Sequence, residues 1–184
     1  MGSALIVTSE PERCGNALEA VQAGLANRHD VRTLDLASFR PSMSEAEWKA
    51  YHTDTPITDP RVAEHAELVQ HAAVLTFVYP TVMWGPPPGL KAWLERVLVP
   101  GVAFVLDDNH RVRPNLTNLR AIGGFTVHEQ TRRELRVAGD GGKRILLRAL
   151  RLNAPRRLTT AWVHSHALHD DRFPGFVEQA ARRL

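Results

Sequence analysis

The chain has 184 residues, of which 43% are hydrophobic and 23% charged, the proportions of a globular protein with one stable core. The formal net charge of +3 is too small to indicate nucleic-acid binding, and no basic motif interleaved with aromatic residues is present. The single cysteine excludes an intramolecular disulfide and any multi-cysteine zinc or iron–sulfur site. The first apolar stretch stops at Thr8, too early for a signal peptide or membrane span, so we expect a cytoplasmic protein without membrane insertion.

Short apolar runs alternate with helical patterns along the chain. The run Ala4–Val7 is apolar throughout, as is typical of a strand buried on both faces, and Ala72–Tyr79 gives the clearest pattern of this kind. Between them, Leu18, Val21 and Leu25 recur at helical spacing and predict a helix. The predicted strands cover 4–7, 30–36, 72–79, 119–127 and 157–166, and the predicted helices cover 14–27, 60–71, 88–98, 140–152 and 175–184, whereas 37–59 show no regular pattern.

This alternation of strands and helices predicts an α/β fold. A parallel sheet needs a crossover between successive strands, and right-handed crossovers through helices on both faces provide it. The predicted elements most simply form a doubly wound five-stranded parallel sheet of order 2-1-3-4-5. No repeat, linker or low-complexity segment interrupts the sequence, so residues 1–184 are predicted to form a single domain.

The topology also predicts where a ligand binds. In a sheet of this order, ligands lie beyond the carboxyl ends of the strands, between the first and third strands, where the strand order reverses. Loops 8–16, 80–88 and 126–142 meet at that place.

The first of these loops has small or polar residues at the start of a helix. Free backbone N–H groups at a helix start favour an anion such as a phosphate. Helix capping is the alternative role for the same residue types. The residues concerned are Ser9, Cys14, Gly15 and Asn16.

Bulky side chains occupy the second loop, where solvent would be expected. Met83 and Trp84 follow Pro80 and precede three consecutive prolines, which stiffen the backbone around them. A rigid loop with exposed N–H groups and an aromatic side chain could form one wall of a site for a flat ring system. A hydrophobic plug beneath the loop is the alternative.

Residues 77–104 read FVYPTVMWGPPPGLKAWLERVLVPGVAF. This segment resembles the flavodoxin-like NAD(P)H dehydrogenase (quinone) family of NAD(P)H oxidoreductases, whose pattern is F-x-x-P-x-x-W-x-x-x-P-x-x-L-K-x-W-x-[DE]-R-V followed by G-x-A-[YF]. Weaker similarity extends over most of the chain. The matching residues are Phe77, Pro80, Pro87, Leu90, Lys91, Trp93, Glu95, Arg96, Val97, Gly101, Ala103 and Phe104.

Two of the ligand loops, and the segment after the fourth predicted strand, depart from the family pattern. The family begins its first loop with a histidine and ends it with S-F-N, whereas this chain has Ser9 and then CGN at 14–16. The tryptophan of the second loop comes one residue late, as Trp84. The T-T-G-G segment of the family corresponds here to TVHE at 126–129.

The resemblance implies a flavin enzyme with NAD(P)H as co-substrate. FMN is favoured over FAD, because the long loops that hold an adenine group are not evident. The implied cycle is ping-pong: NAD(P)H reduces the flavin, and a quinone-like acceptor then oxidises it. His128 is the candidate proton donor, with a surface or capping role as the alternative. The implied cofactor contacts are Ser9, Cys14, Gly15 and Asn16 at the phosphate, Pro80, Thr81, Val82, Met83 and Trp84 around the ring, and Thr126 and Val127 near the pyrimidine side.

The resemblance also implies a homodimer with shared active sites. The predicted helix 88–98 carries four apolar residues at helical spacing. We expect their apolar surface to be larger than one face of the sheet can cover. The apolar segment 101–106 follows, and the resemblance implies that it packs on a second subunit, with Phe104 near the flavin of the partner.

Three further features have a structural and a functional interpretation. Residues 132–157 hold nine basic residues against two acidic ones, which favours a solvated helix face over attraction of NAD(P)H phosphates.

His164 and His166 share one face of a predicted strand and His169 follows, but no carboxylate is placed beside them, so no metal site is predicted. Cys14 is expected to pack in the core, with a lowered thiol pKa as the alternative.

Two other functions fit the same fold. The main alternative is a regulatory flavodoxin-like subunit, such as an ancillary protein of a potassium-efflux system. A yellow protein that turns over NAD(P)H would distinguish the enzyme from that subunit. A flavodoxin-type electron carrier would be strongly acidic, whereas this chain has a net charge of +3.

Overall fold

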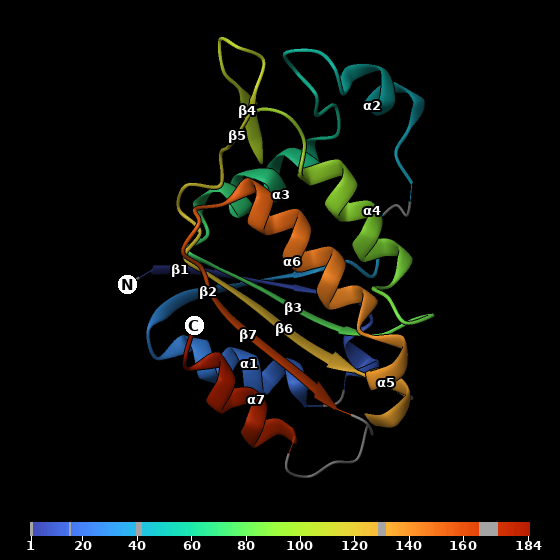
Figure 1. Cartoon of the computed structure of the whole chain (residues 1–184), viewed down its shortest axis with the longest axis vertical. Helices are drawn as coiled ribbons and strands as arrows, with labels where there is room; N and C mark the ends of the chain where they lie inside the picture. Colours follow the sequence, from blue (N-terminus) through green and yellow to red (C-terminus); the bar gives the residue numbers. More distant parts are fainter. Residues whose placement is uncertain (1, 15, 40–41, 129–131, 166–172) are drawn as a thin grey trace.

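A parallel sheet of five strands forms the centre of the computed structural model, which describes residues 2–14, 16–39, 42–128, 132–165 and 173–184 (Figure 1). The strand order is β2-β1-β3-β6-β7, and every neighbouring pair is parallel. Numbered within this sheet alone, the order is 2-1-3-4-5, so the predicted doubly wound fold is confirmed. The strands are β1 (Gly2–Thr8), β2 (His29–Asp35), β3 (Val74–Pro80), β6 (Ala121–Val127) and β7 (Thr159–Ser165).

Helices cover both faces of this sheet, as Figure 1 shows. Successive residues of β1 point to opposite faces, so Ala4 and Ile6 pack with α1 and α7, whereas Leu5 and Val7 pack in the core beneath α3, α4 and α6. Each layer therefore has its own apolar core. The helices are α1 (Ala17–Ala26), α3 (Pro60–His71), α4 (Pro88–Val97), α6 (Gly141–Asn153) and α7 (Phe173–Ala181).

Aspartates set the starts of two helices on the second face. The Asp59 carboxylate accepts a 2.9 Å hydrogen bond from the Arg61 N–H, and Pro60 occupies the first turn of α3. The Asp140 Oδ1 atom accepts a 2.8 Å bond from the Lys143 N–H at the start of α6. The second oxygen of Asp140 is left for another partner, which matters for the site described below.

The structure contains short elements that the sequence did not predict. Helix α2 lies within 37–59 and begins with a reciprocal cap, in which the Ser44 hydroxyl accepts from the Glu47 N–H and the Glu47 carboxylate accepts from the Ser44 N–H. None of the described helices combines the length and apolar character needed to span a membrane. The additional elements are the 3-10 helix η1 (Pro11–Arg13), α2 (Glu45–Ala50), α5 (Arg132–Ala138) and a hairpin of β4 (Phe104–Leu106) and β5 (Val112–Pro114).

The apolar side of α4 is buried within the chain itself. Leu90, Trp93 and Val97 are fully buried and Leu94 is 6% exposed. The Trp93 ring meets Phe77 of β3 edge-on at 6.4 Å between centroids. The expectation that this helix has surplus apolar surface for a second subunit is therefore wrong, because the sheet and neighbouring segments of the same core already cover it.

Arg96, on the same helix, is a buried cation. Its side chain is 2% exposed and donates to Glu47 at 2.5 Å and to Asp59 at 2.7 Å. The guanidinium also lies 4.6 Å above the Phe39 ring centroid. Burial alone would raise the pKa of both carboxyls, but the hydrogen bonds that they accept outweigh it and lower both pKa values. The arginine of the family pattern is thus a structural residue.

Candidate functional site

The carboxyl ends of β1, β3, β6 and β7 reach one edge of the sheet (Figure 1). The register places Thr8 beside Val78, Tyr79 beside Thr126, and Thr126 beside His164. The described residues that follow β1, β3 and β6 therefore lie close together at this edge, and α5 lies beside it (Figure 1).

The loop after β1 leads into the start of α1. Ser9 is 5% exposed, and its N–H donates to the Val78 carbonyl at 3.3 Å. Asn16 occupies the N-cap position, but its side chain makes no capping bond to any residue that the structure describes. The capping role of Asn16 is therefore not supported. The Ala17 N–H donates to the Cys14 carbonyl at 3.2 Å, but the N–H groups of Leu18 and Glu19 have no hydrogen-bond partner among the described residues and retain capacity for another acceptor. Gly15 lies outside the described residues.

Cys14 packs in the core beneath this loop. It is 2% exposed, and its Sγ atom contacts the Glu10 carbonyl at 3.7 Å. Burial, followed by the charges of Glu12 and Glu10, raises the pKa of the thiol to about 12. The alternative of a lowered pKa is therefore wrong, because nearby carboxylates and desolvation both disfavour the thiolate at this helix start.

The second loop contains a tight turn with strained geometry. Val82 and Gly85 exchange two backbone hydrogen bonds of 2.9 Å, and Met83 and Trp84 between them have φ angles of 48° and 65°. Two successive positive φ angles are those of a type I′ turn, which normally takes Asn-Gly. Met83 is 90% exposed, so it is not a plug, whereas Trp84 is half-buried. The Trp84 carbonyl accepts a 3.1 Å bond from the Gly141 N–H, which ties this turn to the start of α6.

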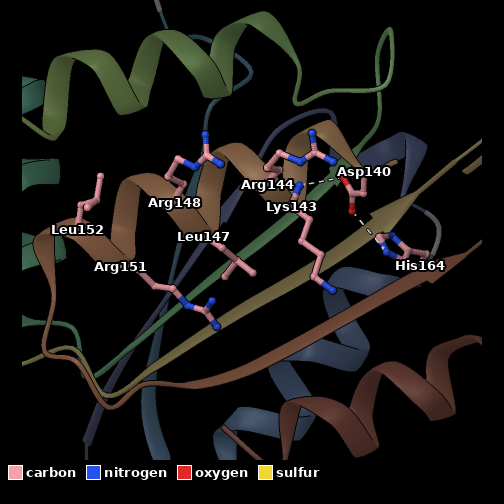
Figure 2. A pocket seen from close by; sticks show the side chains of 8 residues that line it. All are labelled: Asp140, Lys143, Arg144, Leu147, Arg148, Arg151, Leu152 and His164. Atoms are coloured by element: carbon pink, nitrogen blue, oxygen red, sulfur yellow. Dashed lines mark hydrogen bonds and ion pairs between the residues drawn. The ribbon is translucent and has the colours of Figure 1, made fainter. Parts of the chain in front are cut away.

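A groove of about 690 Å³ runs along the exposed side of α6 (Figure 2). In Figure 2, Lys143 and Arg151 extend to one side of the helix, and Arg144 and Arg148 extend to the other. Asp140 and His164 lie together at the end of the groove next to the carboxyl ends of the strands. Only part of the basic set counted in 132–157 therefore lines this groove, but the members on α6 make its surface strongly positive. The lining residues are Asp140, Lys143, Arg144, Leu147, Arg148, Arg151, Leu152 and His164.

The loops after β3 and β6 are joined through Thr81. This residue follows Pro80 and is 8% exposed, and its N–H and hydroxyl both bond to the Val127 carbonyl, at 2.9 and 3.2 Å. The Thr81 hydroxyl also lies 3.0 Å from Nδ1 of His128, a residue that is only 2% exposed. His128 is therefore held inside the protein and is not a surface residue.

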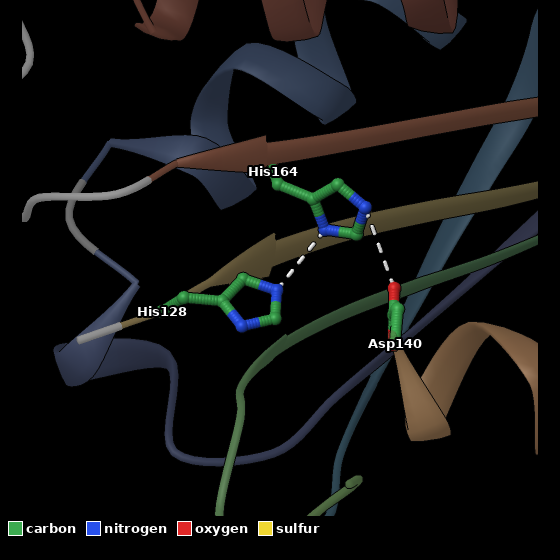
Figure 3. A group of neighbouring side chains, drawn as sticks. All are labelled: His128, Asp140 and His164. Atoms are coloured by element: carbon green, nitrogen blue, oxygen red, sulfur yellow. Dashed lines mark hydrogen bonds and ion pairs between the residues drawn. The ribbon is translucent and has the colours of Figure 1, made fainter. Parts of the chain in front are cut away.

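His128 belongs to a cluster with His164 and Asp140 (Figure 3). Its Nε2 atom lies 3.0 Å from Nδ1 of His164, and the rings meet edge-on at 4.9 Å between centroids. Nε2 of His164 faces Oδ2 of Asp140 at 3.4 Å. The Thr126 hydroxyl contacts both rings, at 3.0 Å from His128 Nε2 and 2.8 Å from His164 Nδ1.

A close approach of α6 to the sheet completes this region. A Cβ atom on Gly142 would lie 2.4 Å from the Tyr79 hydroxyl, so only glycine fits there without a shift. The Tyr79 hydroxyl is buried without a hydrogen-bond partner among the described residues. Burial, and then the charge of Asp140, raises the pKa of this phenol far above its usual range.

The structure brings most of the predicted site residues to this edge, but not all. Thr81, Thr126, Val127 and His128 contact one another, as the distances above show. Phe104 lies on the β4–β5 hairpin, which stands at the other end of the molecule (Figure 1). Sequence reasoning missed Asp140; its position before two glycines at a helix start was the available signal.

The residues at this edge can be tested against a flavin. The uncapped start of α1 offers N–H donors, and the turn at Met83 and Trp84 offers backbone groups and an aromatic ring. The negative charges of Glu10 and Glu12 would repel a phosphate at this place. The nearby cation Arg13 offsets little of that repulsion, because it forms an ion pair with Glu10 at 2.6 Å. A flavin therefore fits if backbone donors bind its phosphate, as is common at helix starts.

Solved structures of similar shape span nearly the whole chain. The Streptococcus mutans protein Smu.1420 has 22% identity and a TM-score of 0.77, covering 99% of this chain and 100% of its own. An NAD(P)H:quinone oxidoreductase from Methanothermobacter marburgensis has 22% identity and a TM-score of 0.73, covering 99% and 94%. An FMN-dependent NADH-azoreductase from Bacillus anthracis, solved with FMN, has 15% identity and a TM-score of 0.74, covering 100% and 99%.

A search of curated proteins finds no significant match. A family model described as the flavodoxin-like fold matches residues 3–128, which is more than half of the chain and includes β1, β3, β6 and His128. The matched segment contains most of the sheet and the loops after β1 and β3 described above. The chain therefore belongs to the flavodoxin-like family.

Proposed function

We propose that this protein is an FMN-dependent oxidoreductase that transfers reducing equivalents from NAD(P)H to quinone-like acceptors. The family, together with the quinone oxidoreductase and the FMN-dependent azoreductase of similar structure, supports a flavin at the carboxyl edge of the sheet. The observation that carries the proposal is the turn at Met83 and Trp84. Two bulky residues are held in a strained conformation where the topology places a ligand, and such strain is typical of functional loops.

The residues of the chain would bind and orient the cofactor. A bound flavin supplies hydride-transfer chemistry that amino-acid side chains lack. The backbone around Ser9, Cys14 and Asn16 would bind its phosphate, and Trp84 would contact the ring. Thr126 and Val127 would border the pyrimidine side. Cys14 would contribute only its backbone, since its thiol is buried.

No proton-donor role is proposed for His128. It is 2% exposed, and both of its ring nitrogens already lie 3.0 Å from protein groups. A residue in this position would not reach a substrate without a rearrangement of the loop.

The groove on α6 would attract the phosphates of NAD(P)H. Lys143, Arg144, Arg148 and Arg151 give it several positive charges, and it begins at His164, next to the proposed flavin edge. Clefts lined by charge of one sign concentrate ligands of the opposite sign.

A homodimer is part of the proposal, through the apolar segment 101–106 that the resemblance implied and without helix α4, whose apolar side is buried in its own chain. The β4–β5 hairpin exposes apolar side chains: Leu106 and Val112 are each 58% exposed and Val105 is 40% exposed. Phe104 begins this hairpin, far from the carboxyl edge of its own chain (Figure 1), so it could meet a flavin only in a second copy. Light scattering tests this point: a 20.5 kDa monomer with full activity would contradict the dimer.

FMN titration and turnover test the proposed function. Untagged protein should quench FMN fluorescence at a one-to-one ratio and oxidise NADH or NADPH in the presence of a benzoquinone. The double change Arg148→Gln and Arg151→Gln should raise KM for the nucleotide without changing FMN affinity. Arg156→Gln, an exposed residue outside the groove, is the matched control.

The outcomes separate the candidate functions. Absence of FMN binding at micromolar concentration would refute the flavin site. Binding without turnover would refute the enzyme and support the regulatory subunit. Equal KM values for the groove variant and the control would refute the role of the groove.

A further inference from the structure

The cluster of His128, His164 and Asp140 has the composition of a metal site. One ligand atom from each residue lies within 4.8 Å of the other two (Figure 3). Two imidazoles and a carboxylate are ligands that Zn²⁺ and related divalent ions accept. The His128 and His164 nitrogens are 3.0 Å apart, close to the separation of about 3.3 Å between two ligands of a tetrahedral zinc with Zn–N of about 2.0–2.1 Å. The 4.8 Å limit on the separations within the cluster is wider than this value, so a bound ion would draw the ligand atoms together.

The contacts of Thr81 fix the tautomer of His128. The Val127 carbonyl can only accept, so both hydrogen bonds of the Thr81 hydroxyl exist together only if it donates to that carbonyl and accepts from His128 Nδ1–H. His128 is then protonated on Nδ1 and presents a lone pair on Nε2 to His164. Metal-binding histidines are commonly oriented in this way, through a hydrogen bond from the nitrogen that does not bind the metal.

Two other polar atoms lie in front of that lone pair. His128 Nε2, His164 Nδ1 and the Thr126 hydroxyl all lie within 3.0 Å of one another. Each ring nitrogen has either one lone pair or one proton, so it cannot form good hydrogen bonds to both of the other atoms at once. A cation bound by the two ring nitrogens would replace these competing hydrogen bonds with metal–ligand bonds.

Asp140 adds a negative charge, and its second oxygen has no hydrogen-bond partner in the part of the chain that the structure describes. Its side chain is 9% exposed; Oδ1 caps α6, and Oδ2 is buried without a hydrogen-bond partner among the described residues. Within that part of the chain, no lysine or arginine side chain forms an ion pair with Asp140, and His164 faces it at 3.4 Å. A buried carboxylate oxygen normally has a hydrogen bond or a bound cation.

We propose that His128, His164 and Asp140 bind one divalent transition-metal ion of the zinc class at the carboxyl ends of β6 and β7. Two neutral imidazoles and one carboxylate leave the ion with a net positive charge and an open coordination position. That position faces the end of the groove on α6, since Asp140 and His164 both line it. An anionic group or a water molecule in the groove would complete the coordination.

Calorimetry with Zn²⁺ tests the site directly. Untagged full-length protein, treated with a chelator and then desalted, should bind one Zn²⁺ per chain. With Co²⁺ it should develop the visible absorption of a four-coordinate ion. Asp140→Asn retains an oxygen to cap α6 but loses the charge, and it should weaken Zn²⁺ binding by tenfold or more. His164→Gln should weaken it at least as much.

His71→Gln is the matched control, because His71 lies on α3 and is exposed. It should bind Zn²⁺ like the unchanged protein. Circular dichroism establishes that each variant is folded, and His128→Gln is the further test if either of the others is not. No binding of Zn²⁺ or Co²⁺ at micromolar concentration by the unchanged protein would overturn the proposal, as would unchanged affinity in folded Asp140→Asn and His164→Gln. FMN titration of the same samples separates this outcome from that of the proposed flavin function.

Discussion

Replacing Met83 by asparagine should stabilise the protein. Met83 and Trp84 occupy the central positions of the turn between Val82 and Gly85, with φ angles of 48° and 65°. Asparagine is the residue most often found at the first of these positions in type I′ turns. Its short polar side chain tolerates the left-handed region, whereas the methionine side chain gains nothing there.

The magnitude follows from the geometry and exposure. A residue with an ordinary side chain in the left-handed region costs roughly 1–2 kcal/mol, of which asparagine should recover about 1 kcal/mol. Met83 is 90% exposed, so its removal sacrifices little buried apolar area. The free energy of unfolding should therefore rise by about 1 kcal/mol, which corresponds to roughly 2–4 °C in Tm for a chain of this size.

Urea unfolding of Met83→Asn and Met83→Gln provides the measurement. Glutamine is also polar but does not favour positive φ, so Met83→Gln should have the stability of the unchanged protein. If Met83→Asn is no more stable than Met83→Gln, the strain inferred from the φ angles is not stored in this turn.

Three further predictions concern other parts of the chain. Trp84→Ala should weaken FMN binding roughly 2- to 10-fold, the equivalent of about 0.5–1.5 kcal/mol for an aromatic contact, whereas Trp48→Ala, which removes a side chain that is 68% exposed, should leave it unchanged. Cys14 should react with iodoacetamide at pH 8 about 10³-fold more slowly than a free thiol, because its pKa is raised to about 12, and rapid labelling of the folded protein would contradict its burial. The pKa of Glu47 is lower in the folded chain than in the unfolded chain, so its contribution to stability is complete above the unfolded pKa and is lost as the pH falls through the folded pKa. Glu47→Gln should lower the free energy of unfolding by about 3 kcal/mol at pH 7 and by less at pH 3, and equal losses at both pH values would argue against the ion pair with Arg96.

The sheet could be predicted from the sequence because its central strands are nearly continuous apolar runs. Residues 74–80 are all buried, and an apolar run of this length, bounded by polar segments, is typical of a central parallel strand. Helix α2 was missed because it has six residues and buries only Glu47, so no apolar periodicity marks it. Its one signal was the capping pair Ser44 and Glu47, which is short and common. The β4–β5 hairpin was missed for a similar reason, since each strand has three residues.

The sequence predicts where the candidate site lies, but not which side chains contact one another within it. Topology alone brings the loops after β1, β3 and β6 to one edge, and the structure agrees. The pairing of His128 with His164 depends on the register of β6 and β7, which places Thr126 beside His164. Contact with Asp140 also depends on how closely α6 approaches the sheet, and Gly142 permits that approach. Register and approach distance are set by tertiary packing, so spacing along the chain did not reveal them.

The ion pairs of Arg96 have a consequence for how the protein opens locally. Glu47 and Asp59 lie 49 and 37 positions before Arg96, and both bond to the same buried guanidinium. The segment between them cannot detach from α4 without exposing or isolating a charge, so it should open with α4 as one cooperative unit instead of fraying. Backbone amides of α2 should therefore exchange with deuterium nearly as slowly as those of α4, although a six-residue helix on its own would be unstructured in water.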